Sequence, residues 1–530
     1  MKRWNGWGNV DTDYPVPPSA LEYLTKVLGP LDPVPDAAKE TLLAAVTECR
    51  LPAHPLVDTS AEARLTHARG HSMRDWVDLR YGRANTFPDG VAFPQTDEDV
   101  RDLLKCARDT GARVIPYGGG TSVVGHITPS QSDVPVLTLS LETMTRLLDL
   151  DETSRLATFQ AGVAGPQLEG QLKARGYTLG HFPQSFEYST LGGWIATRSS
   201  GQQSYHYGRI EHHFAGGILE TPRGRLEMKP VPASAAGPDV REMALGSEGR
   251  LGVITQAKVR VRRMPEAEAF FGAFFPSWEQ GSDAVREIAQ NELPVSMLRL
   301  SNPLETETTL ILSGKSWVGL ADRGLRTIGY GDTRCLLMFG VTGSRRLLQR
   351  TRREVAALCR QYGWLFVGTL VGHTWEKNRF LAPYLRNTLW DRGVAIDTLE
   401  TALPWSQVRE ASRAIPQAIM DAMSKHNERL LAFSHLSHVY RDGASVYTTF
   451  LFRRTADPDE LLERWQTMKH EATLTLQEYG GTITHQHGVG MDHAPYLPAE
   501  KGALGMDALR AVCKSFDPDG MMNPGKLLID

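Results

Sequence analysis

The chain has 530 residues, of which 41% are hydrophobic and 22% charged, and its formal net charge is −3. This length exceeds what one hydrophobic core usually supports, so we expect a globular protein of two or three domains. The nearly balanced charge argues against nucleic-acid binding. No apolar run approaches the roughly 18–20 residues of a transmembrane helix.

The cysteines and the two ends of the sequence indicate the cellular compartment of the protein. Five cysteines are scattered at unpaired spacings, which indicates reduced thiols rather than a disulfide framework. The first eight residues lack the apolar core of a signal peptide, and the last residues match no peroxisomal address. We therefore expect a cytoplasmic protein.

Residues 1–84 are predicted to form a helical entry segment rather than an independent domain. The segment begins with two tryptophans, Trp4 and Trp7, and a helical pattern covers residues 37–46. From residue 85 the pattern changes. Thr96 and the acids at 97–99 predict a capped helix that ends at Gly111. Strands at 134–139 and 157–162 and a helix at 166–175 follow, so residues 85–265 are interpreted as an α+β domain of short strands.

A glycine-rich stretch from Pro116 to Gly125 follows the short apolar strand 113–115. Its three consecutive glycines permit positive φ and leave no side chains in the way, so backbone N–H groups can converge on one anion. The spacing is neither that of a Walker loop nor that of a Rossmann fingerprint. Taken alone, the stretch is equally compatible with a simple turn between strands.

Two later stretches favour a phosphate cradle over a simple turn. In residues 183–201, Ser189 and Thr190 precede two glycines and an apolar turn, which is the pattern of a helix N-terminus that can hold a phosphate. The small polar residues at 199–201 leave room for a planar ring. In residues 246–255, glycines interrupt a strand, as happens where a ligand meets the backbone.

The pattern of predicted secondary structure changes again after about residue 265. Strands are predicted at 270–275, 336–341, 430–437 and 445–452, with helices at 282–290, 347–362 and 460–479. This alternation predicts a substrate or cap domain over residues 266–465, built from antiparallel strands with flanking helices. Residues 466–530 are predicted to form a C-terminal helical segment that carries a histidine motif.

That motif, residues 484–490, contains the first catalytic candidates. His485 and His487 flank one residue on a glycine-constrained turn. They could instead be metal ligands or surface histidines, but no carboxylate stands between them and no HExxH pattern exists, so we expect no metal site. Tyr447 lies in a predicted strand, where it is either a core residue or an acid–base group tuned by a partner.

Two arginines complete the candidate set. Arg299 lies in an apolar strand, where a charge is costly unless it meets an anion. Arg386 precedes the stretch from Asp397 to Trp405. Each is either a substrate-binding group or a structural arginine in a salt bridge.

The three loop stretches, in this order, resemble the PCMH-type FAD-binding domain of the vanillyl-alcohol oxidase / p-cresol methylhydroxylase superfamily. The resemblance implies an α+β fold with a two-subdomain FAD-binding domain and a cap domain. Because only His126 follows the first loop, we expect the FAD to be noncovalent. The implied FAD contacts are Gly118, Gly119, Gly120, Thr121, Ser122, Val123, Gln184, Ser185, Ser189, Thr190, Thr197, Arg198, Ser199, Ser200, Glu248, Gly249, Leu251, Gly252, Val253 and Ile254.

Within this superfamily, most of the chain resembles the alkylglycerone-phosphate synthases (alkyl-dihydroxyacetonephosphate synthases). The resemblance implies Tyr447, His485 and His487 as catalytic residues and Arg299 and Arg386 as substrate contacts. Gln486, also a substrate contact, replaces the middle histidine of the family's triplet, and an amide cannot carry charge near pH 7.

The implied reaction exchanges the acyl group of acyl-dihydroxyacetone phosphate for a fatty alcohol, which forms an ether lipid precursor without net redox change. A lipid-like substrate, a homodimer and peripheral contact with a membrane are expected with it.

An FAD-linked D-2-hydroxyacid dehydrogenase, of the lactate or glycolate type, is the main alternative. Such enzymes resemble this chain in their flavin domain and carry a Glu-His-Gly motif that helps to build a metal site. Here the corresponding residues are Gln486, His487 and Gly488, so the carboxylate is missing. A flavin-binding protein without catalytic activity would leave the arginines, tyrosine and histidines unexplained.

Overall fold

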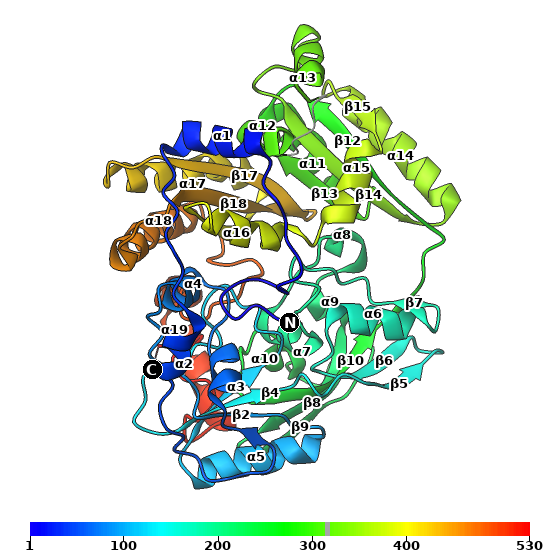
Figure 1. Cartoon of the computed structure of the whole chain (residues 1–530). Coiled ribbons are helices and arrows are strands. Elements are labelled where there is room, and N and C mark those ends of the chain that lie inside the picture. The colour runs from blue at the N-terminus through cyan, green and yellow to red at the C-terminus, as the bar shows by residue number, and fades with distance from the viewer. Residues whose placement is uncertain (313–317, 530) are drawn as a thin grey trace.

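The computed structural model describes residues 1–312 and 318–529. Figure 1 shows two halves, one above the other, and the chain passes between them several times. The lower half is built on small sheets and the upper half on one large sheet. The predicted α+β class is confirmed.

The first 84 residues lie along both halves instead of forming a core of their own. The first helix, α1, packs against α12 and β17 of the upper half, and α4 packs against α18. Ser72 and Asp75 form a capping box that starts α4. The elements of this segment are α1 (Pro18–Leu28), α2 (Lys39–Ala44), β1 (Val57–Asp58), α3 (Ala61–Thr66) and α4 (Met73–Arg80).

The lower half contains a four-stranded sheet in the order β1-β2-β4-β3 and a five-stranded antiparallel sheet in the order β5-β6-β10-β8-β9. The predicted helix at 97–110 is α5, and Thr96 and Asp99 form its capping box. The elements are β2 (Gly90–Ala92), α5 (Asp97–Asp109), β3 (Arg113–Tyr117), β4 (Val136–Ser140), β5 (Leu147–Asp151), β6 (Leu156–Gln160), α6 (Gly165–Lys173), β7 (Tyr177–Thr178), α7 (Leu191–Thr197), α8 (Ser204–Tyr207), α9 (Ile210–His213), β8 (Phe214–Thr221), β9 (Gly224–Met228), α10 (Arg241–Ala244), β10 (Val253–Arg260) and β11 (Arg262–Arg263).

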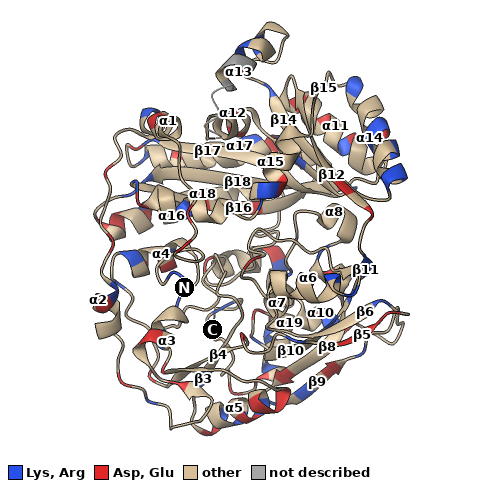
Figure 2. Cartoon of the chain, turned by 45° about the vertical axis from the view of Figure 1, so that its right-hand side comes forward, with Lys and Arg blue, Asp and Glu red and all other residues tan. Residues whose placement is uncertain are grey.

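The upper half is a seven-stranded antiparallel sheet in the order β15-β12-β14-β13-β17-β18-β16. Helices flank it, and arginine-rich α14 packs against β14 and β12 (Figure 2). The elements are β12 (Ala267–Phe275), α11 (Trp278–Gln290), β13 (Met297–Ser301), α12 (Pro303–Leu312), α13 (Val318–Thr327), β14 (Cys335–Gly343), α14 (Arg345–Arg360), β15 (Leu365–Gly368), α15 (Leu370–Asn378), α16 (Ala382–Trp390), β16 (Val394–Pro404), α17 (Trp405–Ser424), β17 (Leu430–Val439), β18 (Gly443–Arg453) and α18 (Pro458–Glu478).

The C-terminal segment returns to the lower half after α18. It contains η1 (Ala494–Tyr496) and α19 (Leu497–Phe516). Residues 521–523 then pair with the edge of β3, since the Val114 N–H donates to the Met521 carbonyl and the Asn523 N–H to the Val114 carbonyl. The expected domain boundary at residue 465 falls inside α18, a single helix that packs against α17 of the upper half. None of the described helices is both long enough and apolar enough to cross a membrane.

Candidate active site

A cavity of about 590 Å³ lies between the two halves. All three predicted FAD loops contribute to its wall, and the cap contributes Arg299, Arg386 and Tyr447. Gln486 and His487 also line it. Of the predicted FAD contacts, the following line the cavity: Gly118, Gly119, Gly120, Thr121, Ser122, Val123, Gln184, Ser185, Ser189, Thr190, Thr197, Ser199, Ser200, Glu248, Gly249, Gly252, Val253 and Ile254.

Three predicted site residues are placed elsewhere. Arg198 has a left-handed backbone conformation, and its guanidinium meets Glu242 at 2.5 Å near the surface. Leu251 is 3% exposed and belongs to the hydrophobic core. His485 is buried behind the cavity wall, in a polar cluster described below.

The first glycine loop is suited to bind an anion because no side chains cover its backbone N–H groups and because it packs closely against residues 188–190. A Cβ on Gly119 would lie 1.8 Å from the Tyr188 carbonyl oxygen, and one on Gly118 would lie 2.3 Å from Thr190 Oγ1. The backbone N–H groups of residues 119–123 make no hydrogen bond to any residue that the structure describes. These unused donors suit the pyrophosphate of FAD.

Glu248 and His126 connect two of the FAD loops to the C-terminal histidine motif. The Glu248 carboxylate accepts hydrogen bonds from the backbone N–H groups of Val489 and Gly490 at 2.5 and 2.8 Å. His126 Nε2 lies 3.1 Å from Glu248 Oε2, and His126 Nδ1 lies 2.8 Å from Ser122 Oγ. Both ring nitrogens of His126 therefore face protein groups, which does not favour a covalent bond from this residue to the flavin.

Tyr447 occupies the centre of the cap side of the site. It lies on β18, paired with Glu400 of β16 on one side and His435 of β17 on the other. Its ring stacks on His435, with centroids 4.9 Å apart, and meets the edge of the His487 ring at 5.8 Å. Burial raises the pKa of Tyr447 above its ordinary value. The phenol is therefore neutral at neutral pH with the chain's own residues around it.

The two predicted arginines differ in their partners. Arg299 Nη2 lies 2.8 Å from Glu305 Oε1, and the same oxygen is 2.9 Å from His435 Nδ1. Burial opposes ionisation of Glu305, but His435 and Arg299 outweigh it and hold the pKa of Glu305 at about 2. The charge of Arg299 is thus largely compensated.

Arg386 has no such partner among the described residues. Its Nη1 donates to the His71 carbonyl at 2.5 Å and its guanidinium lies 4.2 Å from the centre of the Trp76 ring. Its Nε and Nη2 have no hydrogen-bond partner within the described ranges. Burial lowers the pKa of Arg386 to about 10, which still leaves it charged at pH 7. Asp397 and Asp75 act on it only from beyond ion-pair distance. A buried cation without a direct ion-pair partner is a candidate anion-binding group.

His485 belongs to a cluster with Glu400, His438 and Arg209. One ligand atom each from Glu400, His438 and His485 lies within 4.8 Å of the other two, which is close enough to share a metal ion. However, Arg209 Nη1 lies 2.7 Å from His485 Nε2. A guanidinium can only donate, so His485 Nε2 accepts and Nδ1 keeps its proton, facing Glu400 Oε1 at 3.1 Å. These residues suit a hydrogen-bonded cluster better than a metal site.

Sequence reasoning assigned no role to Glu305, His435, Glu400 or Arg209. The first three become site residues only because neighbouring strands or a following helix bring them together, and their separations along the chain give no motif. A charge within a predicted strand, such as Glu400 in β16, is the one available signal.

A two-subdomain flavin domain, a cap sheet and a shared cavity together define a flavoprotein of the vanillyl-alcohol oxidase / p-cresol methylhydroxylase type, and its cofactor is FAD. The family model of the FAD binding domain matches residues 88–228, and that of the C-terminal domain of FAD linked oxidases matches residues 264–527.

More specific relatives share nearly the whole chain. An alkyldihydroxyacetonephosphate synthase of Dictyostelium discoideum is 31% identical over 88% of this chain and 77% of that protein. One of Trypanosoma brucei brucei is 30% identical over 99% of this chain and 92% of that protein. A solved structure of an alkyldihydroxyacetonephosphate synthase matches with a TM-score of 0.85 at 27% identity, covering 99% of this chain and 98% of the other. The chain belongs to the alkyldihydroxyacetonephosphate synthase family. Relatives named for oxidation of glycolate or D-lactate are more distant, at 27% and 24% identity.

Proposed function

We propose that this protein is an FAD-dependent alkyldihydroxyacetonephosphate synthase, which exchanges the acyl group of acyl-dihydroxyacetone phosphate for a fatty alcohol. The observation that carries this proposal is the Arg386 guanidinium, which has no ion-pair partner among the described residues and lies in the same cavity as Tyr447 and the FAD loops. A buried charge without a partner is costly, and the phosphate of the substrate would supply the missing anion.

In this proposal, different residues of the chain bind the phosphate, transfer the proton and position the tyrosine. Arg386 holds the phosphate, and the Tyr447 hydroxyl exchanges a proton with the substrate carbon next to the ketone. Glu305, held by Arg299, fixes the His435 ring on which Tyr447 stacks. Leu24, Trp375 and Leu389 give the cavity an apolar wall for a long alkyl chain. When bound, FAD supplies an electron-poor isoalloxazine ring.

Gln486 lines the cavity in place of a family histidine. Its amide can donate and accept hydrogen bonds but adds no charge, so the phosphate charge is balanced mainly by Arg386. His485 acts as a positioning residue in this proposal, since it is buried behind Gln486 and His487.

Purified holoenzyme with acyl-dihydroxyacetone phosphate and a fatty alcohol should release fatty acid and form the ether product, while the flavin ends the reaction oxidised. Anaerobic D-lactate or glycolate should leave the flavin oxidised as well. Bleaching of the flavin by either hydroxy acid, without ether formation, would favour the dehydrogenase alternative. A cytoplasmic location, a homodimer and peripheral contact with a membrane remain predictions that accompany this proposal.

A further inference from the structure

The first ten residues form a closed loop, which we call the N-terminal strap (residues 1–10). Lys2 and Asn9 form an isolated antiparallel bridge, the Arg3 N–H donates to the Gly8 carbonyl, and the Val10 N–H donates to the Met1 carbonyl. Arg3 Nη2 closes the loop further on Asp13 at 2.8 Å.

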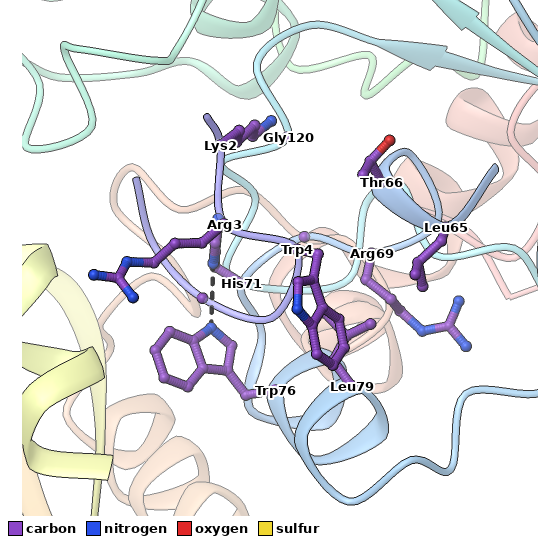
Figure 3. A pocket seen from close by; sticks show the side chains of 12 residues that line it. Lys2, Arg3, Trp4, Leu65, Thr66, Arg69, His71, Trp76, Leu79 and Gly120 are labelled. Carbon is purple, nitrogen blue, oxygen red and sulfur yellow. Dashed lines mark hydrogen bonds between the residues drawn. The ribbon is translucent and has the colours of Figure 1, made fainter. Parts of the chain in front are cut away.

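The strap is held by both halves of the protein. Lys2 Nζ donates to the Tyr117 hydroxyl and to the Gly119 carbonyl of the first FAD loop, at 3.0 and 3.1 Å. Figure 3 shows Lys2 beside Gly120. On the cap side, the Asn387 side chain accepts from the Trp7 N–H and donates to the Trp7 carbonyl, both at 2.9 Å.

Because the strap is bound closely on both sides, the Trp-Asn-Gly-Trp-Gly sequence requires glycine at two of its positions. A Cβ on Gly6 would lie 2.5 Å from Asn387 Oδ1. A Cβ on Gly8, whose φ is +77°, would lie 2.2 Å from the Tyr384 ring. Side chains at either position would push the strap off α16, so the sequence is shaped to bring Trp7 to one fixed place.

That place is the wall of the active-site cavity. Trp7 lines the cavity and is 5% exposed, and its indole Nε1 has no hydrogen-bond partner among the described residues. Its ring lies 4.8 Å from the His71 ring, and the His71 carbonyl is the group that receives Arg386 Nη1. Asn387, which fixes Trp7, is the next residue after Arg386. Trp7 and Arg386 thus flank His71 with unused N–H donors, and the His71 ring itself is fixed by a hydrogen bond from Trp76 (Figure 3).

We propose that Trp7 and Arg386 together form the oxyanion subsite for the substrate's phosphate, with the Trp7 indole N–H as its second donor. Buried donors without acceptors are rare in native proteins because each costs free energy, and two beside one cavity indicate an absent acceptor. An indole N–H is neutral and only donates, so it would favour an oxyanion without changing the charge balance set by Arg386. This inference rests on the proposed function for the identity of the phosphate ester.

The test compares Trp7→Phe with Trp4→Phe in the FAD-loaded protein. Both substitutions remove an indole N–H from the same strap, but Trp4 packs with Leu42 and Leu65 and does not line the cavity. The probe is dihydroxyacetone phosphate, with unphosphorylated dihydroxyacetone as the uncharged comparison. Calorimetry measures its dissociation constant, and proton–nitrogen spectra of indole-labelled protein report the Trp7 N–H, assigned by its loss in Trp7→Phe.

We expect dihydroxyacetone phosphate to move the Trp7 indole resonance and Trp7→Phe to weaken its binding at least about tenfold, as for a lost hydrogen bond to a charged group. The KM of Trp7→Phe for acyl-dihydroxyacetone phosphate should rise by a similar factor, with kcat nearly unchanged. Trp4→Phe should match the wild type in the resonance shift, the dissociation constant and the KM. Saturation without movement of the Trp7 resonance, an equal shift with dihydroxyacetone, no binding of the phosphate ester, or wild-type affinity in Trp7→Phe would each overturn the inference. If the ester moves the resonance but no ether product forms, the subsite stands and the proposed function fails.

Discussion

The rings of His435 and Tyr447 stack on neighbouring strands of the cap sheet, 4.9 Å apart and inclined by 16°. The stack fixes the phenol where it meets the cavity, and Glu305 in turn fixes His435 at 2.9 Å. Tyr447 is thereby held by residues that do not themselves need to react.

Replacing Tyr447 with Phe should leave FAD content normal and lower ether formation by at least the ~10²-fold typical of a lost acid–base group. Because burial raises the pKa of Tyr447, turnover that depends on the phenolate should still increase with pH above 9, and the Phe variant should lose this increase. Rates across pH measure both effects. Tyr362→Phe, at a tyrosine that does not line the cavity, is the control. Near-normal turnover in the Tyr447 variant would assign the proton to His487 instead.

Substitution by lysine should have different kinetic effects at Arg386 and at Arg299. Arg386→Lys keeps the charge but loses the planar fork, so the KM for acyl-dihydroxyacetone phosphate should rise about tenfold with a smaller change in kcat. Arg299→Lys disturbs the contact with Glu305 that orients His435, so kcat should fall more than KM rises. Steady-state kinetics separate the two, and the exposed Arg413→Lys provides a baseline. The assignment of the phosphate to Arg386 fails if that variant binds substrate normally.

Gly119→Ala should abolish FAD binding, because the added Cβ would lie 1.8 Å from the Tyr188 carbonyl oxygen and force the two loops apart. The flavin-to-protein absorbance ratio measures the loss. Gly170→Ala, within α6 and with no atom within 4 Å of the added Cβ, is a matched control. It should keep full FAD and gain up to about 1 kcal/mol of stability from helix propensity. Normal flavin content in Gly119→Ala would show that the loops can separate without cost to the site.

FAD should be released by acid precipitation, since His126 is engaged by Ser122 and Glu248. Yellow supernatant and a colourless pellet are the expected result. Flavin that stays with the pellet, and with a tryptic peptide that contains His126, would show a covalent bond.

Activity should not depend on a metal ion, because Arg209 keeps a proton on the His485 nitrogen that faces Glu400. Dialysis against a chelator should change neither flavin content nor turnover, and metal analysis should find no stoichiometric zinc, iron or manganese. A stoichiometric metal, together with loss of activity on chelation, would assign Glu400, His438 and His485 as its ligands.

Local patterns in the sequence predict much of this protein. The glycine triplet, the hydroxyl pair before Gly192 and the glycine-interrupted strand at 246–255 each carry their backbone conformation in their own residues, so all three were recognised and all reach one cavity. Capping residues likewise predict the start of α5. Such features depend on neighbours only a few positions apart.

Contacts between distant segments could not be predicted in the same way. Arg299 is compensated because a helix brings Glu305 back to β13. Arg386 lacks such compensation because no carboxylate of the described residues comes within ion-pair distance of its guanidinium, although Asp397 and Asp75 lie farther away. Strand pairing keeps His485 out of the cavity wall. Trp7 reaches the cavity because it is bound by Asn387, which lies 380 residues away along the chain. The sequence determined which groups can bind FAD and move protons, because those are properties of residue type and local backbone. The tertiary structure decided which of those groups meet, because burial and charge compensation are set by the residues that folding brings alongside.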